Sequence, residues 1–293
     1  MSGKFDFTDK VMLVTGGAGG IGSALCHRFA AAGARCVVVD IDGVRAERLA
    51  AELPGAGHTG IGCDLLRRAD LERLFEQVAD VHGRIDVLVN NVGMTSSERF
   101  DVRSVESIER EITLNLTSPL VATRIAIPLL KASRDARVVT TVSLGGIFPL
   151  GETPIYTASK FGLRGAMLAI GLDLRSKGIL AGSVLPSATD TRMLRQEAVD
   201  GGNSMQFQDQ PQQPANVVTA VVSLLDRPRL EAYPRSGESR LVRFAMLVPN
   251  LLPRIFPLFR RRGDRGMARY LEELHRRGLA RQTDGRWELV EEA

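Results

Sequence analysis

Short β-type apolar runs alternate with longer helical segments through residues 11–186, and this alternation is the feature that most constrains the fold. Strands separated by helices of this length form βαβ units, whose crossovers are right-handed. The sequence therefore predicts an α/β fold with a doubly wound parallel sheet. The strand-type runs are VMLVT (11–15), CVVVD (36–40), TGIGCDL (59–65), IDVLVN (85–90), RVVTTVS (137–143) and LAGSVLP (180–186).

The first strand-type run leads into a glycine-rich turn, TGGAGGIG at residues 15–22, and a helical segment follows it. In this context the turn can bind the pyrophosphate of a dinucleotide, because a helix N-terminus supplies free N–H groups and a favourable dipole. We expect Gly16 to make the tight turn, Gly20 to let the pyrophosphate approach, and Gly22 to let the helix pack on the sheet. A plain strand-to-helix turn is the alternative. The dinucleotide interpretation predicts a Rossmann fold.

Asp40 ends the second strand-type run, 18 residues after Gly22. A carboxylate at this point can accept hydrogen bonds from both adenosine ribose hydroxyls of NAD. The same carboxylate would repel the 2′-phosphate of NADP, and the neighbouring Ile41 offers no cation to offset that repulsion. The sequence therefore predicts NAD as the cofactor, with a solvated strand end as the alternative reading of Asp40.

Tyr156 and Lys160 stand four positions apart in the stretch IYTASK, which is about one turn of a helix. For an arbitrary pair at this spacing, a surface pair on an amphipathic helix is the usual explanation. The sharper hypothesis is a phenol whose pKa is lowered by the neighbouring ammonium, so that it works as a general acid or base.

From about residue 8 to residue 230 the chain resembles the classical short-chain dehydrogenases/reductases. TGGAGGIG resembles the TGxxxGxG turn of that family, and NNVG at 90–93 resembles its NNAG motif with Val in place of Ala. LPSATDT at 185–191 resembles its PGxxxT segment, with Ser187 in place of Gly. The positions that match the catalytic tetrad of the family are Asn115, Ser143, Tyr156 and Lys160.

The resemblance implies a role for each of these residues. Tyr156 would exchange a proton with the substrate, its pKa lowered by Lys160 and by the positive nicotinamide, and Ser143 would hold the substrate oxygen. Lys160 would also bind the nicotinamide ribose, and Asn115 would organise a water relay. Asp64 would contact the adenine amino group and Thr191 the carboxamide. The full set of implied cofactor contacts is Gly16, Gly20, Ile21, Gly22, Asp40, Asp64, Leu65, Asn91, Tyr156, Lys160, Pro186 and Thr191.

Substrate selectivity is expected from two segments, Leu144–Leu150 after Ser143 and residues 193–213 after Thr191. The first is apolar, which favours a lipophilic secondary alcohol and its ketone as the substrate pair. The alternatives are an NADPH-dependent carbonyl reductase and a dinucleotide sensor without turnover. A homodimer or homotetramer is implied by the family, in which the helix of Tyr156 often packs on its symmetry mate. The Gln- and Pro-rich residues 206–214 predict a mobile loop.

Positive charge is concentrated near the C-terminus. Residues 227–286 contain 15 Arg and 6 acidic residues, whereas residues 1–226 contain 23 basic and 25 acidic residues. We therefore divide the chain into a catalytic domain over 1–235 and a basic, apolar extension over 236–293. Residues 236–262 are apolar, but Pro249, Pro253 and Pro257 interrupt them, so a transmembrane helix is not expected.

Two interpretations of the extension remain open. One is extra helix packed on the domain or across a dimer interface, including an amphipathic helix over Met267–Leu279. The other is a segment that contacts a membrane surface, in a fold that acts as a membrane-docked scaffold. No recognition motif for nucleic acid and no metal-ligand spacing accompanies the Arg residues. The three unpaired Cys and the lack of a secretory signal predict a cytoplasmic protein, with membrane association as the alternative.

Overall fold

The computed structural model describes residues 4–290, apart from the side chains at positions 236, 238, 239, 241 and 255. The main sheet consists of β1 (Val11–Thr15), β2 (Arg35–Asp40), β3 (Thr59–Gly62), β4 (Val87–Asn90), β5 (Arg137–Thr141), β6 (Leu180–Val184) and β7 (Glu231–Ala232). Its order is β3-β2-β1-β4-β5-β6-β7, and every neighbouring pair runs parallel. The predicted doubly wound parallel sheet is confirmed.

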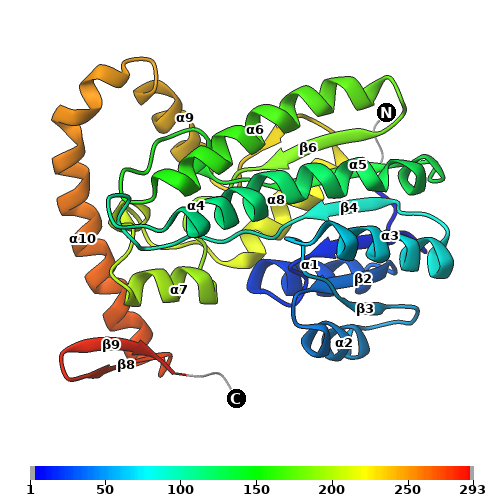
Figure 1. The fold of residues 1–293 in the computed structure, drawn as a ribbon, viewed down its shortest axis with the longest axis horizontal. Helices are drawn as coiled ribbons and strands as arrows, with labels where there is room; N and C mark the ends of the chain where they lie inside the picture. The colour runs from blue at the N-terminus through cyan, green and yellow to red at the C-terminus, as the bar shows by residue number, and fades with distance from the viewer. Residues whose placement is uncertain (1–3, 291–293) are drawn as a thin grey trace.

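Helices cover both faces of this sheet (Figure 1). They are α1 (Gly20–Ala30), α2 (Gly43–Glu52), α3 (Arg68–His82), α5 (Ser118–Lys131), α6 (Pro154–Arg175) and α8 (Pro214–Asp226). Two short helices, α4 (Val105–Ile112) and α7 (Arg192–Val199), lie outside these layers. Successive strand residues point to opposite faces, so Met12 packs with α1 and α8 while Leu13 packs with α3, α5 and α6. Burial on both faces explains why the strands are continuous apolar runs.

Helices α4 and α5 are joined by a π-helical turn, η1 (Thr113–Thr117). The combined run Val105–Lys131 is long and apolar enough to cross a membrane by length and composition. Some of its apolar side chains pack inside the protein, since Ala122, Ala126 and Leu130 are buried against the sheet. Glu111 is also buried, and it pairs with Arg103 at 2.6 Å. One face of the run therefore packs in the domain, while 28% of its most apolar window is buried.

The C-terminal extension packs on the domain near α7. It contains α9 (Ser236–Ala245), η4 (Pro249–Leu251), α10 (Leu252–Arg276) and the hairpin of β8 (Ala280–Thr283) and β9 (Arg286–Leu289). Figure 1 shows α10 standing along one side of the molecule, with the hairpin at its end beside α7. A third apolar cluster joins α7 and η3 (Ser204–Phe207) to α10; its buried members are Leu194, Ala198, Phe207, Tyr270, Leu271, Leu274 and Ala280.

This cluster favours the packing interpretation for the second half of the extension, and the helix expected over Met267–Leu279 is the end of α10. The first half is different, because Phe244, Leu247 and Leu258 are exposed. For that half the membrane-surface interpretation stays a prediction.

Residues 206–214, expected to form a mobile loop, are packed instead. Phe207 and Gln212 are 1% exposed. The backbone N–H of Gln212 donates to Ala188 O at 2.8 Å, and that of Asp190 donates back to Gln212 O at 2.8 Å. Gln and Pro content indicated the irregular backbone but not these tertiary contacts.

Candidate active site

A groove of about 750 Å³ lies at the carboxyl ends of the strands, where the strand order reverses between β1 and β4. Most residues expected to bind a dinucleotide line it. They are Gly16, Gly20, Ile21, Asp40, Asp64, Leu65, Asn91, Tyr156, Lys160, Pro186 and Thr191. Ser143 lines it as well, whereas Gly22 and Asn115 lie behind its walls.

The glycine-rich turn leaves no room for side chains. Gly16 has φ +62°, a left-handed conformation that favours glycine. A Cβ at Gly22 would lie 2.0 Å from Gly16 O, so Gly22 lets α1 close onto the turn, as expected. A Cβ at Gly20 would lie 3.0 Å from Thr191 Cγ2 across the groove. The turn thus forms a bare backbone cradle at a helix N-terminus, which fits the pyrophosphate of a dinucleotide.

Asp40 stands at the end of β2, beside this cradle. Its Oδ2 accepts from Ala18 N at 3.1 Å and its Oδ1 from Asp42 N at 3.3 Å. The turn therefore fixes the carboxylate where an adenosine ribose would lie.

The sequence analysis missed a cation at this end, Arg45 of α2. Its Nη2 donates to Ala18 O at 3.0 Å, and the side chain lines the groove with Asp40. The residue directly after Asp40 is Ile41, and inspecting only that position overlooked Arg45. A signal was present, since Asp42 caps α2 and Arg45 stands in its first turn.

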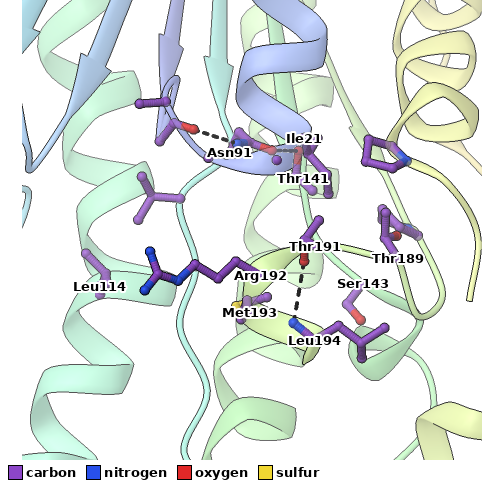
Figure 2. Close-up of a pocket in the computed structure, with 18 of the residues that line it drawn as sticks. Ile21, Asn91, Leu114, Thr141, Ser143, Thr189, Thr191, Arg192, Met193 and Leu194 are labelled. Carbon is purple, nitrogen blue, oxygen red and sulfur yellow. Dashed lines mark hydrogen bonds between the residues drawn. The ribbon is translucent and has the colours of Figure 1, made fainter. Parts of the chain in front are cut away.

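Polar side chains join the strand ends under the middle of the groove. Asn91 Nδ2 donates to Thr15 O at 3.3 Å, and Thr141 Oγ1 donates to Asn91 Oδ1 at 3.2 Å (Figure 2). These bonds link the ends of β1, β4 and β5. Asp64 Oδ1 accepts from Leu66 N at 3.0 Å, which holds the turn after β3. These hydrogen bonds therefore tie together the loops that form the floor of the groove.

Ser143, Tyr156 and Lys160 come together at the other end of the groove. A Cβ at Gly145 would lie 3.1 Å from Tyr156 Cε1 and 3.4 Å from Ser143 Oγ, so both side chains adjoin Gly145. Lys160 Nζ lies 5.6 Å from the Tyr156 ring centroid and donates to Thr141 O at 3.4 Å. Lys160 is 3% exposed, which excludes the surface-pair explanation.

Burial controls the ionisation of this pair. It raises the pKa of Tyr156 to about 12, against the lowering effect of the hydrogen bond with Ser143. It lowers the pKa of Lys160 to about 8, against the raising effect of Glu111. The protein alone therefore does not lower the pKa of Tyr156, because desolvation outweighs the hydrogen bond with Ser143. The sequence suggested that a positive nicotinamide lowers the pKa of Tyr156. That contribution would come from the cofactor and not from the protein.

Asn115 braces the site from behind. It lies in the π-helical turn η1 and is fully buried. Its amide makes a two-way bond with the backbone of Met94, with both distances 2.8 Å, and Nδ2 also donates to Ser159 Oγ at 3.1 Å. These bonds tie the segment after β4 to α6, the helix of Tyr156 and Lys160. These bonds give Asn115 a structural role, and the water relay stays a prediction.

The substrate end is lined differently from what the sequence suggested. No side chain of Leu144–Leu150 lines the groove, and Ile147 and Phe148 are buried in the protein instead. The second expected segment does contribute, and it carries unexpected polar groups. Its lining residues are Met193, Leu194, Arg195, Glu197, Gln206 and Gln213, and Arg192 precedes them.

Arg192 and Glu197 give this end charged groups. Figure 2 shows the Arg192 side chain extending across the groove towards Leu114 of η1. Glu197 is 5% exposed, and Gln206 Nε2 donates to both of its oxygens, at 2.7 and 2.8 Å. Burial raises the pKa of Glu197 to about 7. Within residues 4–290 no group of three or more His, Cys, Asp or Glu side chains is arranged to hold a metal ion.

Comparison with known proteins identifies the group to which this geometry belongs. Residues 10–200 match the family model of the short chain dehydrogenases. The chain is 31% identical to a 3beta-hydroxysteroid dehydrogenase of Mediterraneibacter gnavus, over 68% of this chain and 72% of that protein. It is 32% identical to a D-threitol dehydrogenase of Mycolicibacterium smegmatis, over 69% and 78%. A short-chain dehydrogenase from Sphingobium yanoikuyae, solved with NADPH, is 29% identical with a TM-score of 0.71, over 83% and 95%.

Proposed function

Because the chain belongs to the short-chain dehydrogenase family, we propose that it is an NAD(H)-dependent enzyme that interconverts a lipophilic secondary alcohol and its ketone. As a family member it is an oxidoreductase that acts on CH–OH groups with a nicotinamide dinucleotide. The observation that carries the proposal is the meeting of Ser143, Tyr156 and Lys160 at one end of a groove whose other end has a glycine cradle and Asp40.

The choice of NAD rests on Asp40, whose carboxylate is fixed beside the cradle by two backbone N–H groups. A 2′-phosphate next to this carboxylate would meet like-charge repulsion. Arg45 supports the alternative, an NADPH-dependent carbonyl reductase, because its guanidinium lies at the same end of the groove. Its bond to Ala18 O leaves the other guanidinium N–H groups available for a phosphate. Asp40 therefore predicts a preference for NAD, whereas Arg45 predicts a preference for NADP.

The nicotinamide, when bound, accepts or supplies the hydride. Ser143 Oγ would donate a hydrogen bond to the substrate oxygen and stabilise the charge that develops on it. Tyr156 Oη would exchange the proton with that oxygen. With its pKa raised to about 12, the phenol is protonated at neutral pH, which is the form that donates a proton to a ketone. Oxidation needs the phenolate, and Lys160 is the cation that stabilises it from within the protein.

The lipophilic substrate is supported by the apolar side chains of Leu114, Met193 and Leu194 at the substrate end. Arg192 narrows the class, because a wholly apolar compound would leave its guanidinium without a partner on the substrate. A mainly apolar alcohol with a second polar group fits this lining best. The named substrates of the relatives, a hydroxysteroid and a polyol, differ widely, so the class proposed here rests on the lining of this chain.

Calorimetric binding of NAD⁺ and NADP⁺ to the purified protein tests the cofactor proposal. We expect NAD⁺ to bind at least about tenfold more tightly, a difference of about 1.4 kcal/mol. Asp40→Ala should narrow the gap, and Arg45→Ala should leave NAD⁺ binding within about twofold. Tighter NADP⁺ binding that Arg45→Ala abolishes would establish the carbonyl reductase alternative instead.

A turnover screen in the same preparation tests the activity. It compares hydrophobic secondary alcohols with polyols at equal concentration, with NAD⁺ as the acceptor. Turnover of polyols alone would contradict the lipophilic class. Tight dinucleotide binding without turnover of any alcohol or ketone would favour the sensor alternative.

A further inference from the structure

The carboxylate of Asp190 joins the C-terminal extension to the active site. Asp190 is 4% exposed and lies between Thr189 and Thr191, at the start of α7. Tyr270 Oη donates to its Oδ1 at 2.7 Å, and Arg277 Nη1 donates to its Oδ2 at 2.8 Å. These partners follow Asp190 by 80 and 87 residues in the chain. Arg195 of α7 adds a third bond, at 2.8 Å to Oδ1.

The carboxylate stays ionised at working pH. Burial on its own raises the pKa of Asp190, but hydrogen bonds from Arg195, Arg277 and Tyr270 outweigh it and lower the pKa to about 2. The folded-state pKa is depressed, so the link is at full strength above the unfolded value near 4 and is lost only as pH falls towards 2. The bonds that Tyr270 and Arg277 make to the Asp190 carboxylate therefore persist across the neutral pH range.

Thr191, next to Asp190, faces the cofactor cradle. Its methyl group lies 3.0 Å from the position of a Cβ at Gly20, so the two opposite walls of the groove nearly touch here. Thr191 Oγ1 accepts from Leu194 N at 3.5 Å and begins α7, and Figure 2 shows Thr189 and Thr191 side by side at the groove. A shift of Asp190 would move both Thr191 and α7 relative to the cradle.

The extension supports the same wall at a second point. A Cβ at Gly263 would lie 2.2 Å from Ser204 O, and one at Gly266 would lie 1.8 Å from Phe207 O, so α10 rests directly on the backbone of η3. Within η3, Gln206 holds Glu197 of the groove lining. The helix thus positions η3 from behind while Tyr270 and Arg277 position Asp190.

We propose that Tyr270 and Arg277 are positioning residues of the active site, which act through Asp190 to hold Thr191 and α7 at the nicotinamide end of the groove. The extension then completes the cofactor site, in addition to covering apolar surface. This inference rests on the proposed function and adds a set of residues beyond the expected cofactor contacts.

The test compares two ligands that divide the groove. NADH spans both ends, whereas ADP occupies only the end built by the glycine turn and Asp40. If the proposal is right, Tyr270→Phe and Arg277→Gln each weaken NADH binding by about tenfold, the order expected for losing a hydrogen bond to a charged group. They should weaken ADP binding by about threefold at most, because only the diphosphate of ADP lies near Thr191. Tyr270→Phe keeps the ring that packs on Phe207 at 5.4 Å.

Arg276→Gln is the matched control. Arg276 is the exposed neighbour of Arg277 at the end of α10, so it loses the same charge without touching Asp190. It should bind NADH and ADP like the wild type. Arg277→Lys should recover part of the NADH affinity, because an ammonium restores one bond to Oδ2. In an Asp190→Ala background, where Tyr270 has no acceptor at position 190, Tyr270→Phe should weaken NADH binding much less than it does alone, since coupled residues are not additive.

Three results overturn the inference. One is unchanged NADH affinity in both single variants. Another is an equal loss of NADH and ADP affinity with a lowered melting temperature, which would mean a general structural role. A full additional loss from Tyr270→Phe in the Asp190→Ala background would mean that Tyr270 does not act through Asp190. Wild-type protein that binds no nicotinamide dinucleotide overturns the proposed function itself, and with it this inference.

Discussion

The two ends of the groove are built in different ways. The adenosine end comes from consecutive residues, since the turn 15–22, Asp40 and Arg45 all belong to β1-α1-β2-α2. The nicotinamide end is assembled from distant parts of the chain: β5 and α6 supply the reactive groups, and α7 and η3 form a wall that α10 supports.

Because the two ends are built differently, we expect substitutions to disrupt them in different ways. The adenosine end is formed by backbone that depends on glycine. A substitution that displaces this backbone should weaken the binding of every adenine nucleotide. A wall held by side chains from a distant helix can move while the cradle stays intact. Pairs of ligands that divide the groove, such as NADH and ADP, therefore separate the two ends experimentally.

Removal of the phenol should have the largest effect and should be confined to chemistry. Tyr156→Phe deletes only the hydroxyl that exchanges the proton, so turnover should fall by about 10²–10⁴-fold, the usual contribution of a general acid or base. Binding of NADH and of ADP should change by less than about twofold. Steady-state rates and calorimetry on the same preparation measure both quantities.

The control for this variant is Tyr233→Phe, which removes a phenol hydroxyl bonded to Glu231 away from the groove. It should retain near-wild-type turnover. More than a tenth of wild-type turnover in Tyr156→Phe would contradict the role given to Tyr156.

A side chain at Gly22 should damage the adenosine end and, with it, both ligands. The Cβ of Gly22→Ala would lie 2.0 Å from Gly16 O, so the cradle must open. Such overpacking costs about 1–3 kcal/mol of stability. NADH and ADP affinity should fall together, by tenfold or more. The control is Gly165→Ala, an exposed position of α6 with no atom within 4 Å of the new Cβ.

Gly165→Ala should keep both affinities and gain about 0.5–1 kcal/mol, because alanine is the better helix former. Calorimetry and denaturant unfolding give the two numbers. Selective loss of NADH alone in Gly22→Ala would show that the two ends are not separable in this way.

A side chain at Gly266 should give the converse pattern at the nicotinamide end. The Cβ of Gly266→Ala would lie 1.8 Å from Phe207 O and would push α10 off η3. NADH affinity should fall about threefold to tenfold, while ADP affinity stays within about twofold. Gly237→Ala, in α9 with no atom within 4 Å of the new Cβ, is the control within the extension. Equal losses of NADH and ADP would remove the contrast with Gly22→Ala.

The same contrast explains what the sequence could predict. Most expected cofactor residues of the adenosine end line the groove, because a turn between adjacent strand and helix is encoded by neighbouring residues. The family resemblance identified the pair Tyr156 and Lys160, whose spacing of one helix turn alone is also typical of a surface pair. Arg45 was missed, although it stands in the same local unit, because only the position next to Asp40 was considered.

The nicotinamide end was harder because its contacts span long stretches of chain. No local pattern links Asp190 to Tyr270, or Gly266 to the carbonyl of Phe207. Apolar residues 144–150 were expected to line the substrate site. A sequence pattern cannot distinguish apolar residues that line a groove from those that form the core, and Ile147 is buried in the core. The effect of burial on the pKa of Tyr156 was missed for a related reason, since desolvation depends on what surrounds the ring, and the effect of a bound nicotinamide stays a prediction.

The last effect we expect concerns stability and not binding: a pH dependence from Glu197 at the substrate end. Burial raises the pKa of its carboxyl from 4.5 to about 7. Because the folded state binds the proton more tightly, this stabilisation is complete below pH 4.5 and is lost as pH rises through 7. Glu197→Gln cannot ionise, so relative to the wild type it should gain about 1–3 kcal/mol between pH 5 and pH 8.

Melting temperatures of the wild type and Glu197→Gln at pH 5 and pH 8 measure this difference. Glu272→Gln is the control, since Glu272 is exposed on α10. Its melting temperature should differ from that of the wild type by the same amount at pH 5 and at pH 8. A Glu197→Gln difference that does not change between the two pH values would mean that the carboxylate is charged throughout. Glu197 would then belong with Asp190 as a fixed charge of this wall, and the polar group expected on the substrate would have to be a cation or a hydrogen-bond donor.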